Sequence, residues 1–162
     1  MGAPLGLALA AVLFVLAASP ALAATRTVNC NVAGANLQAV IDNNAHAGDI
    51  LRVRGTCTGN FTIDKNLKLK GEGSHPTLNG GGTGTTLTIS GVTVVVVVER
   101  LTITGGNAVQ GGGIYNFGTL TLKESTVSRN NAAAGGGIFN TGTVFLLEST
   151  VLRNNPNDCF GC

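Results

Sequence analysis

Two adjacent segments of the chain carry nearly the same sequence at a spacing of 24 residues. Residues 111–134 read GGGIYNFGTLTLKESTVSRNNAAA and residues 135–158 read GGGIFNTGTVFLLESTVLRNNPND, so 15 of 24 aligned positions are identical. Residues 87–110 align more weakly in the same frame. A fixed period of this length is typical of solenoids, in which each repeat buries its apolar face against its neighbours. The repeats therefore predict a solenoid.

Each copy divides into three short pieces in which apolar and polar residues alternate. In the first full copy these pieces are 113–116, 119–122 and 125–128, separated by glycine or asparagine. They are rich in Thr, Val and Leu, and none has the apolar period of a helix. Three strands per repeat, each pairing with its copy about 4.8 Å along the axis, predict a single-stranded right-handed parallel β-helix. The predicted fold class is therefore all-β.

The repeat also predicts which residues stack between neighbouring coils. Apolar residues at equal positions should form a dry interior, and repeated asparagines should form a ladder of side-chain amides that tolerates left-handed turns. The glycine triplets at 111–113 and 135–137 predict corners with positive φ and close backbone approach. The expected stacked residues are Ile114 on Ile138, Leu120 on Val144, Leu122 on Leu146, Val127 on Val151, and the ladder Asn107, Asn131 and Asn155.

The residues before the repeats predict an N-terminal cap and less regular coils. Residues 37–41 have apolar side chains at helical spacing behind Asn36, a favourable N-cap, so we expect a short capping helix within residues 24–49. The β-helix should then occupy residues 50–162 with about four to five coils. The strands expected before the repeats are 51–53, 61–63 and 67–69 in a first coil, and 77–79, 86–89 and 94–98 in a second.

Residues 1–23 predict a secretory signal peptide. An apolar run over 5–18 precedes small residues at A-x-A spacing, which indicate cleavage after Ala23 or Ala24. An uncleaved membrane anchor is the alternative, although the run is shorter than the roughly 20 residues that a span requires. We therefore expect a protein that is secreted or held at the cell surface, with no membrane span after cleavage.

Four cysteines agree with export. They allow three pairings, and the sequence does not choose among them. We favour Cys30 with Cys57, because both precede the repeats, whereas Cys159 and Cys162 form a short C-terminal loop or remain two thiols. His46 and His75 are isolated from other metal-binding side chains, so we expect no metal and no cofactor.

The GGGIYN and GGGIFN blocks, with V-x-x-N at 127–130 and 151–154, resemble a known group. They are similar to bacterial right-handed β-helix repeat proteins of the pectin-lyase-like superfamily, and look like the polymorphic outer-membrane protein type of repeat. The resemblance covers about residues 30–159. In this chain Val stands where F-x-x-N is usual, and G-G-G-I replaces G-G-A-I. The resemblance implies a β-helix and an extracellular role.

The superfamily includes polysaccharide lyases and hydrolases, so catalysis has to be argued from residues. The resemblance implies clustered acidic calcium ligands and a basic residue for a lyase, or several neighbouring Asp for a hydrolase. The weak catalytic candidates are Glu124 and Glu148, which should lie about 5 Å apart on successive coils, a separation that retaining glycosidases use. Because both belong to the repeat, we interpret them as duplicated surface residues. Tyr115 over Phe139 is a candidate sugar platform, but such stacks more often pack the fold.

The formal net charge is +2 and the sequence has no run of Lys and Arg, which disfavours nucleic-acid binding. We expect a non-catalytic protein with an adhesive or glycan-binding role toward extracellular polysaccharide or the cell surface. The alternative is a carbohydrate-active enzyme, of lyase or hydrolase type, or a remnant of one. The sequence leaves the oligomeric state open.

Overall fold

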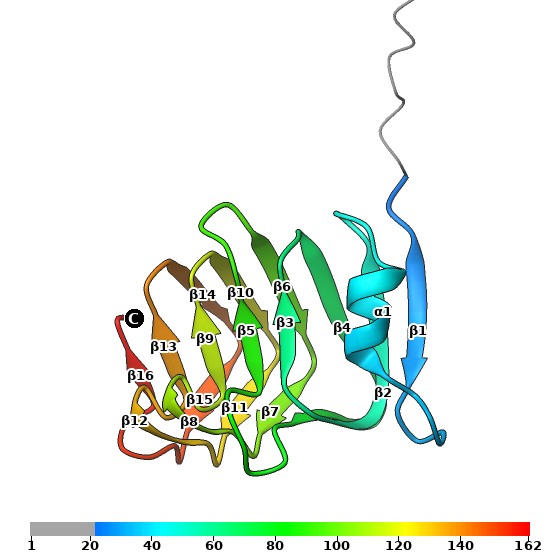
Figure 1. Ribbon diagram of the computed structural model, residues 1–162. Coiled ribbons are helices and arrows are strands. Elements are labelled where there is room, and N and C mark those ends of the chain that lie inside the picture. Colours follow the sequence, from blue (N-terminus) through cyan, green and yellow to red (C-terminus); the bar gives the residue numbers. More distant parts are fainter. Residues whose placement is uncertain (1–21) are drawn as a thin grey trace, which may run out of the picture.

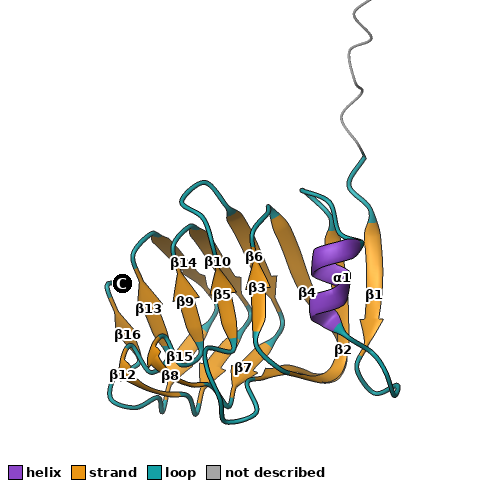
Figure 2. Ribbon diagram, in the orientation of Figure 1, coloured by secondary structure: helices purple, strands orange, loops and turns teal. Residues whose placement is uncertain are grey.

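The computed structural model describes residues 22–162, which form a parallel β-solenoid of about six turns with one short helix (Figures 1 and 2). This confirms the predicted all-β parallel β-helix. The predicted signal peptide, residues 1–23, lies outside the described residues except for its last two. Within the described range, no helix is long and apolar enough to cross a membrane.

The elements along the chain are β1 Thr25–Asn29, α1 Leu37–Asn43, β2 Ile50–Thr58, β3 Phe61–Ile63, β4 Leu67–Asn79, β5 Leu87–Ile89, β6 Val95–Glu99, β7 Thr102–Thr104, β8 Asn107–Gln110, β9 Ile114–Asn116, β10 Thr119–Lys123, β11 Thr126–Ser128, β12 Asn131–Ala134, β13 Ile138–Asn140, β14 Thr143–Leu147, β15 Thr150–Leu152 and β16 Cys159–Phe160.

Strands one turn apart pair in parallel and build three faces (Figure 1). The first face runs β1, β2, β4, β6, β10, β14, and the second runs from the ends of β2 and β4 through β7 and β11 to β15. The third face runs β3, β5, β9, β13, β16. In the repeats the paired residues are 24 apart, as in Thr119 with Thr143.

The sequence predicts four to five coils, whereas the structure has about six turns. The added turn comes from β1, which pairs with β2 although its residues fall in the predicted cap. The sequence predicts strands 67–69 and 94–98 as the last strands of the first and second coils. In the structure both lie on the first face, where each is the first strand of a new turn. The repeats at 87–110 and 111–134 also contain a fourth strand, β8 and β12, which pair with each other and whose Asn and Ala residues have weak β propensity.

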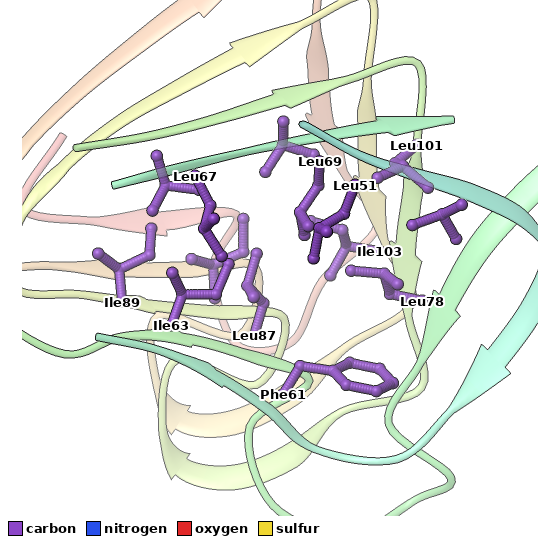
Figure 3. Close-up of a cluster of buried hydrophobic side chains, with 14 of the residues drawn as sticks. Leu51, Phe61, Ile63, Leu67, Leu69, Leu78, Leu87, Ile89, Leu101 and Ile103 are labelled. Carbon is purple, nitrogen blue, oxygen red and sulfur yellow. The ribbon is translucent and has the colours of Figure 1, made fainter. Parts of the chain in front are cut away.

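Apolar side chains at alternate strand positions fill the interior (Figure 3). Leu51, Leu69 and Leu78 are fully buried there. The predicted stacked pairs are in register, but the dry interior does not extend to the last turn. Val144 and Val151 are half-buried and Leu146 is 45% exposed, because within residues 22–162 β14 and β15 pair with a neighbouring turn on one side only.

The N-terminal end of the solenoid is covered by α1. The Asn36 side chain accepts a hydrogen bond from the Ala39 backbone N–H at 3.0 Å and caps the helix. Gln38 exchanges two hydrogen bonds with the backbone of Thr62, so its amide continues the edge of β3. Leu37 and Ile41 of α1 are buried in the core. This end therefore has no open apolar surface over β3.

Two disulfides are present, Cys30–Cys57 and Cys159–Cys162. The first joins the segment after β1 to the end of β2, and the second closes the short C-terminal loop. At the predicted glycine corners, Gly111 and Gly135 have φ of 61°. At the other corners of the two full repeats the left-handed residues are charged, namely Glu124, Arg129, Glu148 and Arg153, and they are not the ladder asparagines.

The buried carboxylate of Asp49 makes the fold sensitive to acid. It accepts hydrogen bonds from the backbone N–H groups of Ala24 (2.7 Å) and His46 (3.0 Å) and from Arg26 Nε (3.2 Å). These contacts, the His46 bond above all, lower the pKa of Asp49. A lowered folded-state pKa contributes stability above the unfolded value of about 3.9, and that stability is lost as the pH falls through the folded value.

We expect the urea midpoint to fall between pH 5 and pH 2, and to fall less in Asp49→Asn, which is less stable at pH 7 but has no proton to gain. Urea unfolding followed by circular dichroism at several pH values measures both. Equal pH dependence in the two proteins would assign the acid sensitivity to other groups.

Candidate functional site

The outer side of the first face gathers six of the chain's ten Lys and Arg side chains. The strand alternation turns Arg52 outward from β2 and Lys70 outward from β4, beside each other in register. The same row continues through Glu99 of β6 to Lys123 of β10. We call this surface the basic face, and it consists of Arg52, Arg54, Lys68, Lys70, Arg100 and Lys123 with the acids Glu72 and Glu99.

An open groove of about 520 Å³ lies on the basic face. Its shape depends on Gly71, because a Cβ there would lie 1.9 Å from the carbonyl oxygen of Arg100. Only glycine lets β4 pass this close to the corner after β6. The residues that line the groove are Arg52, Arg54, Lys70, Gly71, Glu72, Gly73, Pro76 and Arg100.

Each of the two acids on this face is held by more than one cation. Glu72 pairs with Arg52 Nη1 at 2.9 Å and with Arg54 Nη2 at 3.1 Å. Glu99 contacts Lys68, Lys70 and Arg100, and the hydrogen bond from Lys68 is the main cause of its lowered pKa.

With Glu124, which contacts Lys123, six cations stand against three carboxylates, an excess of three positive charges. The side chains of Arg52, Arg54 and Arg100 are 44%, 53% and 48% exposed, so their free N–H groups remain open to a ligand. Guanidinium groups bind carboxylate and sulfate groups through paired hydrogen bonds. The groove can therefore bind a polyanion.

The sequence has no run of Lys and Arg, but the folded chain gathers six of these residues on one face. Arg52 and Arg54 are far along the chain from Lys68 and Lys70, and only the 18-residue register between β2 and β4 brings them together. The signal that could have found them is the R-x-R and K-x-K spacing, which turns both cations of a strand to one side.

The weak catalytic candidates Glu124 and Glu148 lie outside the groove. They occupy equivalent corners between the first and second faces, with φ of 49° and 50°. The Glu124 backbone N–H bonds the carbonyl of Leu147 at 2.9 Å, which sets the two corners on adjacent turns. The Glu124 carboxylate contacts only its neighbour Lys123 among the described cations, at 3.5 Å.

The predicted asparagine ladder is present. Asn131 Nδ2 donates to Asn107 Oδ1 at 2.8 Å, and Asn155 Nδ2 donates to Asn131 Oδ1 at 2.7 Å. All three side chains are exposed. Sequence reasoning missed two buried ladders, Asn130 to Asn154 at 3.0 Å and Asn116 to Asn140 at 2.7 Å, although the same repeat displays these residues.

The aromatic pair is a packing contact. Tyr115 meets Phe139 edge-on with centroids 5.2 Å apart, and Phe160 stacks on Phe139 at 4.8 Å. Phe139 is thereby 8% exposed and presents no open ring face to a sugar.

Within residues 22–162, no three His, Cys, Asp or Glu side chains lie close enough together to hold a metal ion. No protein family, curated protein or solved structure matches the chain. The basic face is thus the surface whose chemistry points most directly to a ligand.

Proposed function

We propose that this protein is a secreted or cell-surface β-helix protein that binds acidic polysaccharide on its basic face without cleaving it. The observation that carries the proposal is the groove lined by four cations and one acid. Parallel strands present these cations in rows across the turns, so an extended polyanion can contact several of them at once. The resemblance to the pectin-lyase-like superfamily and its outer-membrane type of repeat supports the same ligand class.

The carboxylates of the basic face support binding without turnover. Glycoside hydrolysis needs one carboxylic acid that is protonated and one that is free. Glu72 and Glu99 are both ion-paired, and the cations around Glu99 lower its pKa, which opposes protonation. A carbohydrate-active enzyme is the alternative function, and it would be detected by the formation of cleavage products from the same polysaccharide.

Export is supported by the two disulfides, which are typical of oxidising compartments. The position of Ala24 adds to this support. Cleavage after Ala23 would turn the backbone nitrogen of Ala24, 2.7 Å from Asp49 Oδ1, into an ammonium group that pairs with a buried carboxylate. The intact mass of the exported protein should therefore equal that of a chain whose first residue is Ala24.

Arg100→Gln is expected to weaken binding of polygalacturonate about fivefold. The change removes one exposed cation of the groove, which contributes about 1 kcal/mol or less to an ionic contact. Arg129→Gln is the matched control, because Arg129 is also an arginine at a left-handed corner (φ 58° against 53°) but does not line the groove. Kd is measured by isothermal titration calorimetry at low salt.

Binding should weaken as salt rises, and a neutral polysaccharide should not bind. Equal losses in the two arginine variants, or no binding by the wild-type protein, would exclude the basic face as the site. Ultraviolet absorbance from unsaturated sugars, with or without calcium, would instead establish a lyase.

A further inference from the structure

The outer side of the second face carries two parallel columns of uncharged residues. Alternate positions of its strands point outward, and the register stacks these positions on five successive turns, three of which belong to β7, β11 and β15 (Figure 1). We call this surface the hydroxyl face. Its first column is Thr56, Thr77, Thr102, Thr126 and Thr150, and its second is Thr58, Asn79, Thr104, Ser128 and Leu152.

The duplication explains only part of the first column. Its last three members are 24 residues apart, but Thr77 and Thr102 are 25 apart and Thr56 and Thr77 are 21 apart. Thr56 and Thr77 precede the repeats, and the register still brings threonine to the same place. Strands favour threonine in general, but the outward columns of the first face are charged and the third face carries aromatic rings. Strand propensity alone therefore does not account for the column.

Most hydroxyl groups of the hydroxyl face are available to a ligand. Thr77 Oγ1 donates to the carbonyl of His75 at 3.0 Å, and the hydroxyl oxygens of Thr126 and Thr150 lie 3.4 Å apart. The remaining five make no hydrogen bond with another protein group within residues 22–162, and they belong to Thr56, Thr58, Thr102, Thr104 and Ser128. A hydroxyl donates one hydrogen bond and accepts two, so these groups can join an ordered water network.

The backbone holds the hydroxyl face as a rigid grid. Neighbouring turns are about 4.8 Å apart, and alternate residues of one strand are about 6.6 Å apart. The inward residues between the columns, Leu78, Ile103 and Val127, are fully buried, which fixes the strands from below. The oxygen atoms of ice repeat at intervals close to these two lengths. A dissolved chain molecule does not hold its groups on a two-dimensional grid, so the face is best matched by a crystalline partner that several turns contact at once.

We propose that the hydroxyl face binds ice. None of its ten side chains is charged, whereas the first face gathers six cations, so the partner that complements it is a neutral solid and not a polyanion. None of the ten is aromatic, so the face lacks the rings on which the sugars of a crystalline glycan would pack. Ice offers donors and acceptors to the hydroxyl groups, and the threonine methyl groups order the water that lies between them.

The borders of the hydroxyl face limit the contact to the strands. The charged corner residues Glu124 and Arg129 stand before and after β11, and they keep liquid water at both borders of the face. No residue of the hydroxyl face lines the groove of the basic face. Ice binding therefore does not depend on the proposed binding of acidic polysaccharide, and the two are tested separately.

Partition into slowly growing ice tests the proposal, together with inhibition of ice recrystallisation. We expect the wild-type protein to enter the ice and to slow recrystallisation. Thr102→Lys should lower the incorporation about tenfold, because a charged side chain in the middle of the grid prevents the turns from contacting ice together. The fold accommodates lysine at outward strand positions, as at Lys70 and Lys123.

Thr121→Lys is the matched control, because Thr121 is an outward threonine of β10 on the first face, and it should enter ice as the wild type does. Thr104→Lys places the charge in the second column and should repeat the effect of Thr102→Lys. Equal urea midpoints of the lysine variants establish that each is folded.

Exclusion of the wild-type protein from ice would overturn the proposal, and so would equal incorporation of the wild-type protein, T102K and T104K. Equal losses in T102K and T121K would show that added charge alone causes the effect, and would also overturn it. Retention on microcrystalline cellulose without entry into ice would assign the face to a crystalline glycan instead.

Discussion

Leu122→Ala is expected to lower the free energy of unfolding by about 3–4 kcal/mol. The Leu122 side chain is fully buried, with Val98 on one side in register and Leu146 on the other. The backbones of the three strands are fixed by parallel hydrogen bonds, so the turns cannot collapse into the space that the substitution leaves. A buried Leu-to-Ala change then costs both the transfer free energy and the cavity. Urea unfolding of dilute protein measures the loss.

Leu146→Ala is the matched control, because it removes the same side chain at the same register position one turn later. Leu146 is 45% exposed, so its truncation removes less buried area and opens no enclosed cavity. We expect a loss of about 1 kcal/mol in dilute protein. Equal losses for the two variants would mean that the last turn is covered in the monomer and that the C-terminal end is not open.

The contrast between these leucines shows where sequence reasoning reaches its limit. The repeat predicts the parallel register correctly, because identical residues 24 apart can be stacked in only one frame. It also predicts equal burial for both copies, which is wrong for Leu146. Burial depends on the turn that lies above a residue, and the repeat pattern is the same whether that turn is present or not.

The R-x-R and K-x-K spacing predicts that both cations of a strand point to one side, but it does not predict which of these strands are neighbours. The first turns have no common period, since paired residues are 18 apart between β2 and β4 and 29 apart between β4 and β6. Loop lengths set these offsets, and the sequence does not reveal them. The neighbours of Arg52 and Lys70 therefore become known only once the strands are paired.

The repeat likewise does not predict which of the two adjacent asparagines in each copy is buried. Asn130 and Asn131 recur equally 24 residues later, so the period predicts a ladder without distinguishing the two positions. The strand and corner geometry separates them. Asn130 turns into the core with 1% exposure, whereas Asn131 opens β12 and faces the solvent.

Asn130→Ala is expected to cost about 3 kcal/mol of unfolding free energy, several times the cost of Asn131→Ala. The Asn130 Oδ1 atom accepts from the Gly106 backbone N–H at 3.0 Å. Its Nδ2 group donates to the carbonyls of Ile103 and Ser128 and to Asn154 Oδ1. Alanine leaves the Gly106 N–H without its partner and removes the bonds to Ile103 and Ser128, whereas Asn154 Oδ1 keeps its bond from the backbone N–H of residue 130. Each unsatisfied buried group costs about 1–3 kcal/mol.

Asn131→Ala removes two hydrogen bonds whose partners, Asn107 and Asn155, are exposed and can bond water instead, so we expect a loss of about 1 kcal/mol or less. Urea unfolding of the two variants measures the difference.

Asn130→Asp then separates the two roles of the side chain. It keeps an acceptor for Gly106 but sets a carboxylate against two carbonyl oxygens, so it should be at least as destabilising as alanine. A mild effect would mean that the acceptor role alone stabilises this corner, and that the stacked amides contribute little to holding the turns together.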